Sequence, residues 1–269
     1  MRHLTAQHLR VLGEVRHQEV NRMLFSPFLF IYLLICVALL AGLFILIELE
    51  MISYAFLVLG LSPRAAILAL FASLIGSYIN IPLYTVPSDA ISTATTVNNF
   101  GILYQIPIQY AGSGTTVAIN VGGALIPLLI CAYALFRWPS ALLPSVLGMA
   151  IVAYVAHQFA FPVEGLGIAL PLFIPPLTAA VVALLIGKAM GARDSLHVIA
   201  YVSGVLGTLI GADLTNLNRI AELRTPVASI GGMGTFDGVF LTGIVAVLLA
   251  GAGRGRAVEP YENVLTSRE

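Results

Sequence analysis

A long stretch with very few charges constrains this chain more than any other feature of its sequence. Residues 25–186 span 162 positions and hold six charged side chains, Glu48, Glu50, Arg64, Asp89, Arg137 and Glu164. Long apolar runs separate these charges, and about 20 apolar residues suffice for a membrane-spanning helix. The whole chain is only 10% charged, against about 25% in soluble domains. The pattern predicts an integral membrane protein whose main partner is the lipid bilayer.

Charge balance and cysteine usage exclude several other classes of protein. The chain has 13 basic and 13 acidic residues, so it lacks the positive field that nucleic-acid binding needs. The two cysteines, Cys36 and Cys131, lie inside apolar runs, which predicts neither a disulfide framework nor a metal site. Since no nucleotide-binding or metal-binding motif stands out, we expect no cofactor and no metal.

The predicted fold class is all-α, a polytopic bundle of about seven membrane spans. Residues 1–24 read as an amphipathic N-terminal segment, 25–252 as the transmembrane domain and 253–269 as a polar C-terminal tail. Residues 51–61 are apolar but too short to cross, so we expect an interfacial helix there. Residues 84–116 predict a polar loop with room for short strands, of which 104–110 is the best candidate.

The seven predicted spans follow the apolar runs between polar breaks. They cover residues 25–47, 64–82, 117–136, 141–159, 165–187, 195–213 and 236–250. Arginines before the first span favour an N-terminus inside the cell. We therefore expect a multi-pass protein of the inner (plasma) membrane, and the sequence does not indicate its oligomeric state.

Seven alternating spans bring one set of polar residues to a single membrane leaflet. The second, fourth and sixth spans end on the side where the third, fifth and seventh begin. That side carries Asn80, Asn120, His157, Asp213 and Asp237. Polar groups at membrane depth are costly and usually face a cavity inside the protein. The convergence therefore predicts a functional site.

Two aspartates on neighbouring spans carry most of this hypothesis. Asp213 and Asp237 are joined by one connection and are expected at the same depth. Two close carboxylates can share a proton, so that one acts as base and the other as acid. The pair can activate a water for peptide cleavage. The alternative is an ion-coupled transporter or channel, in which these carboxylates with Asn80 and Asn120 bind a cation, a proton or a small solute.

Other polar and small residues near the aspartates are expected to support the site. They are Asn216, His157, Gly232, Gly234 and Thr235. A purely structural interpretation also stays open, because Thr235 can cap the last helix with Asp237 in its first turn. Asn80 and Asn120 can equally form structural hydrogen bonds between helices.

Several short motifs resemble an uncharacterised prokaryotic membrane family, domain of unknown function 1614. They are Gly76-Ser-Tyr-Ile-Asn-Ile-Pro82, Asn120-Val-Gly-Gly, Pro175-Pro176, Gly207-Thr-Leu-Ile-Gly-Ala-Asp213 and Ser229-Ile-Gly-Gly-Met-Gly-Thr-Phe-Asp-Gly238. Together they cover about residues 50–250. The resemblance implies a family membership but no activity.

The layout of the two aspartates also resembles, more loosely, the intramembrane aspartyl proteases of the presenilin and signal-peptide-peptidase kind. Those enzymes carry one aspartate on each of two adjacent spans, the second in a Gly-x-Gly-Asp motif. Here Thr235 and Phe236 separate Gly232-Met-Gly234 from Asp237, and Ala212 precedes Asp213. The resemblance implies a hydrolase that cleaves membrane peptides, with Asp213 and Asp237 as its catalytic residues.

Overall fold

The computed structural model describes residues 27–87, 96–99, 102–105, 114–165, 167–223, 225–232 and 238–252. The predicted N-terminal segment, the predicted C-terminal tail and Asp237 therefore lie outside the described residues. Over the described part the chain is mainly helical, as predicted, with several short strands. It divides into two units, residues 1–51 and 52–269, which we describe separately.

Helix α2 (Pro27–Val58) begins in the first unit with an apolar surface on every side. Its apolar side chains between Phe30 and Ile47 are all exposed except for a few small ones, which suits a lipid environment. The separate interfacial helix predicted for residues 51–61 is wrong, since α2 runs on without a break to Val58. No glycine or proline lies between Ile47 and Val58, and glutamates such as Glu48 are good helix formers.

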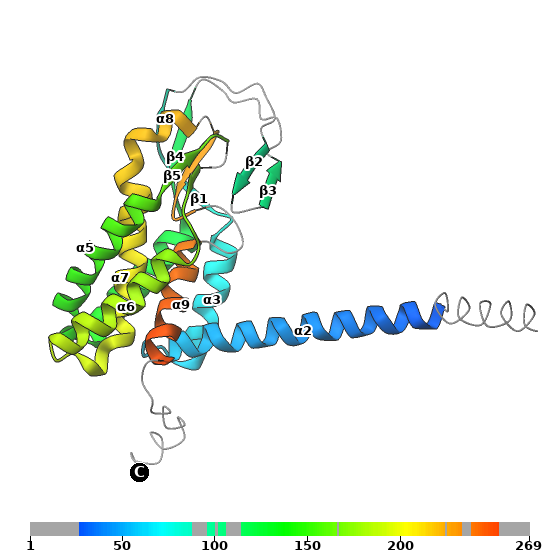
Figure 1. The fold of residues 1–269 in the computed structure, drawn as a ribbon, viewed down its shortest axis with the longest axis horizontal. Helices are drawn as coiled ribbons and strands as arrows, with labels where there is room; N and C mark the ends of the chain where they lie inside the picture. Colours follow the sequence, from blue (N-terminus) through cyan, green and yellow to red (C-terminus); the bar gives the residue numbers. More distant parts are fainter. Residues whose placement is uncertain are drawn as a thin grey trace, which may run out of the picture. The chain divides into compact units, whose positions relative to one another are not determined.

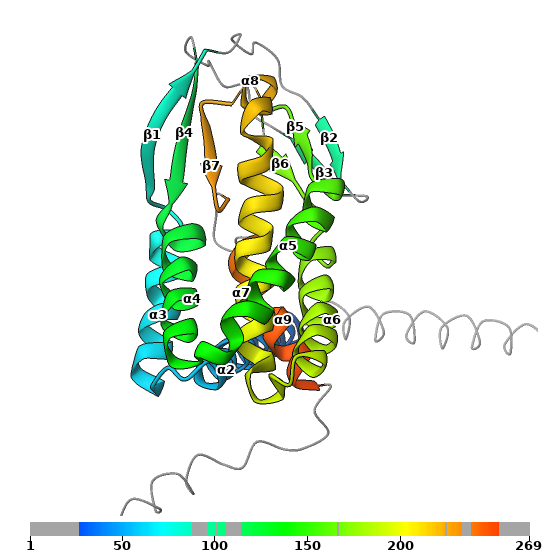
Figure 2. The same ribbon diagram turned by 90° about the vertical axis from the view of Figure 1, so that its left-hand side faces the viewer.

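In the second unit, six apolar helices lie side by side (Figures 1 and 2). They are α3 (Pro63–Gly76), α4 (Ile126–Arg137), α5 (Leu142–Phe159), α6 (Ile174–Ala189), α7 (Leu196–Thr208) and α9 (Gly238–Ala252). Three described helical stretches are long and apolar enough to cross a membrane, Phe30–Val58, Pro139–Phe159 and Arg193–Leu223. Four shorter apolar stretches accompany them, Pro63–Gly76, Val121–Arg137, Ile174–Ala189 and Gly238–Gly251.

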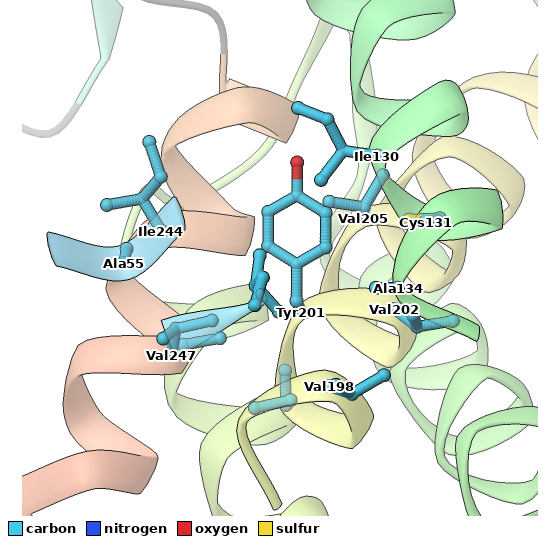
Figure 3. Packing of buried hydrophobic residues seen from close by; sticks show 14 of the residues in the cluster. Ala55, Ile130, Cys131, Ala134, Val198, Tyr201, Val202, Val205, Ile244 and Val247 are labelled. Atoms are coloured by element: carbon cyan, nitrogen blue, oxygen red, sulfur yellow. The ribbon is translucent and has the colours of Figure 1, made fainter. Parts of the chain in front are cut away.

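Helix α7 runs through the middle of this group and continues beyond its regular part. A π-helical turn, η4 (Leu209–Asp213), follows α7, then a 3-10 turn, η5 (Leu214–Arg219), and the short helix α8 (Ile220–Leu223). Tyr201 is completely buried between α4 and α9, with Ile130, Val205 and Ile244 near its ring (Figure 3). The Arg193–Leu223 stretch is 89% buried over its most apolar window, so α7 organises the core.

Strands gather at one end of the helices (Figure 2). Strand β1 (Asn80–Val86) pairs antiparallel with β4 (Thr115–Asn120), and β4 pairs in parallel with β7 (Val227–Ile230). Two hairpins accompany this sheet, β2 (Thr96–Asn99) with β3 (Ile102–Gln105), and β5 (Phe161–Val163) with β6 (Gly167–Ala169).

The sheet corrects the predicted bounds of the second and third spans. Helix α3 stops at Gly76, and residues 80–86 form a strand instead of the last turns of a span. Pro82 cannot continue a helix, and the isoleucine, tyrosine, threonine and valine around it favour a strand. The third helical stretch likewise begins at Val121 and not at 117. Of the predicted strand 104–110, only the first two residues lie in β3, and 106–110 lie outside the described residues.

Two further boundaries differ from the prediction. Helix α6 begins at Ile174 and not at 165. Pro175 and Pro176 stand in its first turn, where a missing N–H costs nothing, so they start the helix instead of kinking it. The predicted polar connection after Asp213 is instead largely ordered as η5, α8 and β7. Helix α5 matches the fourth predicted span closely.

Candidate functional site

A cavity of about 310 Å³ lies where the strands meet the helices. Its walls come from β4, β6, β7, the start of α6, the end of α7 with η4, η5 and α8, and the start of α9. The polar side chains on its wall are Thr208, Asp213, Asn216, Ser229 and Thr242. Asp213 is the only charged side chain among the described lining residues. The cavity thus combines one carboxylate, hydroxyls and an amide with apolar surface.

The π turn η4 ends at Asp213 and fixes the carboxylate in the cavity wall. Asp213 is half-buried, and its Oδ2 accepts a hydrogen bond of 2.8 Å from the backbone N–H of Gly231. A π turn takes up one more residue than an α-helical turn, and such turns often occur at functional sites. The backbone bond holds Oδ2 in place, and Oδ1 is the second carboxylate oxygen that can accept a proton or bind a water.

The loop that holds Asp213 depends on two glycines with left-handed backbones. Gly231 has φ +89° and Gly232 has φ +84°, values that favour glycine. A Cβ on Gly231 would lie 2.7 Å from the backbone nitrogen of Ala124. The loop is therefore packed against the start of the helical stretch 121–137, and Gly232 lines the cavity.

Asn80 and Asn120 meet in the sheet and hold it to the helices. The amide nitrogen of Asn120 donates to Asn80 Oδ1 at 3.1 Å and to the carbonyl of Ser77 at 2.7 Å. Asn120 Oδ1 caps the next helical stretch by accepting the Gly123 N–H at 2.7 Å. Asn80 Oδ1 also accepts the hydroxyl of Ser229 at 2.6 Å, and Ser229 lines the cavity. These amides act through hydrogen bonds within the fold, and neither lines the cavity.

Replacing Asn120 by alanine is expected to lower the free energy of unfolding by about 2–4 kcal/mol, because three hydrogen bonds of a completely buried amide are lost, one of them a helix cap. The measurement is thermal unfolding of the full-length protein in detergent. Asn218→Ala is the control, since Asn218 is exposed on η5 and should change stability by less than about 0.5 kcal/mol. Equal stability of the two variants would contradict the role given to Asn120.

Asn216 lies in the cavity wall, whereas His157 does not. Asn216 is buried, and its amide nitrogen donates to the carbonyl of Ala212 at 2.9 Å. Nδ1 of His157 lies 2.8 Å from the hydroxyl oxygen of Thr215, which itself donates its one hydrogen to the carbonyl of Gly211. Nδ1 must therefore carry the hydrogen of that contact. His157 ties α5 to η5 outside the cavity.

Asp237, Gly234 and Thr235 lie outside the described residues, so the structure does not place their side chains. Gly238, the residue after Asp237 in sequence, does line the cavity. The chain therefore reaches the wall of this cavity one residue after Asp237. Within the described part of the chain, no group of three or more histidine, cysteine, aspartate or glutamate side chains is arranged to hold a metal ion.

Sequence reasoning missed Thr208, Ser229 and Thr242, which also line the cavity. Threonine and serine are common in membrane proteins, both in helices such as those of Thr208 and Thr242 and in strands such as that of Ser229, so their residue type does not mark them. The one sequence feature that could have pointed to Thr208 as a lining residue is its position five residues before Asp213. That signal becomes informative only when the π turn between them is known.

The family model described as "Protein of unknown function (DUF1614)" matches residues 74–249. The chain belongs to the DUF1614 family. The match includes every residue that lines the cavity of this DUF1614 protein. No curated protein and no solved structure matches the chain. The likeness to aspartyl proteases therefore rests on the two aspartates alone.

Proposed function

We propose that this DUF1614 protein is an intramembrane hydrolase whose catalytic pair is Asp213 and Asp237. One observation carries the proposal. The carboxylate of Asp213 stands in the wall of a 310 Å³ cavity, and Gly238, next to Asp237 in sequence, belongs to the same wall. Asp213 and the residue that follows Asp237 in sequence thus belong to the wall of one cavity.

The properties of the cavity support a neutral, partly apolar substrate. Its volume is in the range of small-molecule and peptide sites. Its described lining carries a carboxylate but no basic side chain, so anionic groups are disfavoured. A short segment of a membrane peptide meets both conditions.

The paired carboxylates would hydrolyse the peptide bond in two steps. First, Asp213 takes a proton from a water whose oxygen bonds to the carbonyl carbon, while Asp237 gives its proton to the carbonyl oxygen. This forms a neutral tetrahedral diol. Asp213 then gives its proton to the leaving nitrogen, Asp237 takes a proton from one diol hydroxyl, and the C–N bond breaks. The products are a carboxylic acid and an amine, and both aspartates return to their starting states.

Under this proposal the apolar helical stretches span the inner membrane as seven passes. The support is that the described residues hold three long and four shorter apolar stretches. Three of the shorter ones, Pro63–Gly76, Val121–Arg137 and Ile174–Ala189, meet strands or turns at the end where the cavity lies. Such a site would be shielded from bulk water, which strengthens interactions between charges.

Ion-coupled transport is the second candidate, and the broken helices near the cavity favour it. The 121–137 stretch opens with a π turn, Val121–Leu125, and η4 interrupts the α7 stretch beside the cavity. Interrupted helices often surround the binding sites of transporters. The hydroxyls of Thr208, Ser229 and Thr242 add oxygen ligands beside Asp213.

One experiment separates the two functions. The full-length protein is reconstituted in liposomes with a panel of neutral membrane-spanning peptides in water enriched in ¹⁸O. Hydrolysis predicts new peptide ends whose carboxyl group carries ¹⁸O, detected by mass spectrometry. Parallel vesicles without peptide are assayed for flux of Na⁺, K⁺ and protons. Flux without cleavage across the whole panel would overturn the hydrolase and favour transport.

A further inference from the structure

Among the described residues that line the cavity, Thr208 has a buried side-chain hydroxyl without a hydrogen bond. Thr208 ends the regular part of α7 and is only 3% exposed. Its Oγ1 is buried and has no partner among the described residues, yet the residue lines the cavity beside Asp213. A buried hydroxyl without a partner destabilises a fold, so its presence calls for a physical reason.

The other threonines in the described helical segments behave differently. Thr178, Thr215 and Thr242 each donate to the carbonyl oxygen four residues earlier, at 2.6–2.7 Å. This bond is the usual way in which a helical threonine satisfies its hydroxyl. Thr208 does not form it, although Gly204 is the residue four positions earlier in the same helix. Within the part of the chain that the structure describes, its hydroxyl is thus left available to a further partner.

The π turn aligns Thr208 with Asp213. In an unbroken α-helix, residues four apart share a face, and Ala212 would take the place nearest Thr208. The extra residue of η4 brings position five onto that face, and Thr208 and Asp213 both line the cavity. A hydroxyl and a carboxylate therefore face one space from successive turns of one helical stretch.

We infer that Thr208 is a positioning residue that holds the attacking water beside Asp213. This inference rests on the proposed hydrolase. The water donates one hydrogen to Asp213 Oδ1, which takes that proton in the first step. The second hydrogen bond of the water goes to Thr208 Oγ1, so a lone pair stays directed at the carbonyl carbon of the peptide. Asp213 cannot orient the water alone, because a water held by a single hydrogen bond is free to rotate about that bond.

Two substitutions at Thr208 and one control test the inference in full-length protein. Thr208→Val keeps the shape and removes the hydroxyl, whereas Thr208→Ser keeps the hydroxyl. Thr178→Val removes a hydroxyl that is bonded to Ile174 in α6 and that does not line the cavity. Each variant is examined by thermal unfolding and by kcat and KM in the ¹⁸O cleavage assay.

The expected result separates activity from stability. Thr208→Val lowers kcat about 10²-fold, changes KM little, and melts at or above the wild-type temperature, because a buried unpartnered hydroxyl is gone. Thr208→Ser recovers most of the lost kcat. Thr178→Val keeps wild-type kcat and melts about 2–4 °C lower.

Three outcomes would overturn the role of Thr208 while leaving the hydrolase in place: wild-type kcat in Thr208→Val, no recovery in Thr208→Ser, or a marked drop in the melting temperature of Thr208→Val. The failure of the hydrolase itself looks different. There the wild-type protein shows no ¹⁸O incorporation, or Asp213→Asn cleaves as fast as wild type, and the inference falls with it.

Discussion

Replacing Asp213 by asparagine is expected to slow peptide cleavage about 10²–10⁴-fold, the usual contribution of a general acid or base. Asparagine cannot take a proton from water at neutral pH. Its carbonyl oxygen can still accept the backbone N–H of Gly231, which bonds Asp213 Oδ2 at 2.8 Å in the wild type. The fold should therefore survive, and the measurement is ¹⁸O incorporation into cleaved peptides together with a thermal melt.

Companion variants make this result specific. Asp237→Asn should cause a loss of similar size, since the two acids act as one unit and their effects do not add. Asp213→Ala should lose activity and stability together, because it also removes the acceptor for Gly231. Glu222→Gln is the control, since Glu222 is an exposed acid on α8 whose carboxylate pairs with Arg219 at 3.3 Å. Full cleavage by Asp213→Asn would refute the proposed chemistry.

The largest effect on stability is expected from Gly122→Ala. A Cβ at Gly122 would collide with the carbonyl oxygen of Ser73 in α3 and with the backbone nitrogen of Ser77, which follows α3 directly. Backbone atoms cannot step aside as a flexible side chain can, and the bond of 2.6 Å from Ser73 Oγ to the Gly122 carbonyl would be strained too. We expect a loss of about 3 kcal/mol or more in the free energy of unfolding, measured by thermal unfolding in detergent.

Gly251→Ala is the matched control for this substitution. Gly251 lies near the end of α9 with nothing within 4 Å of its would-be Cβ. Alanine favours a helix over glycine by about 0.5–1 kcal/mol, so this variant should be as stable as wild type or more so. If the Gly122→Ala and Gly251→Ala variants unfolded at the same temperature, the close approach of α3 to the 121–137 stretch would not govern stability.

The sequence predicted a mainly helical fold correctly, because long apolar runs are a strong local signal for helices. The helical character follows from these runs, and the family follows from the short motifs. The structure also brings Asn80 and Asn120 into contact, as their predicted common depth suggested. His157, chosen by the same argument, lies outside the cavity because its imidazole bonds Thr215 on the surface.

The pairing of the strands and the π turn were beyond reach for physical reasons. Residues 80–86 are as apolar as the end of a span, and their pairing with β4, which lies about 30 positions later, is not visible in the local sequence. Strand β7 is four residues long, and its partner lies more than 100 positions earlier in the chain. A π turn changes the spacing of cavity-facing residues from four to five, which a search for α-helical periodicity excludes.

The parallel pairing of β4 with β7 also sets the order of events during biosynthesis. Ser229 bonds Asn80 across 149 positions of sequence, so a ribosome must synthesise nearly the whole chain before the cavity can close. Until then β4 presents an unpaired edge to its surroundings, and contacts of such long range are slow to form. A premature stop anywhere before Val227 would leave this edge without its native neighbour. Truncated products should therefore be recognised by quality-control proteases and not accumulate as smaller folded proteins.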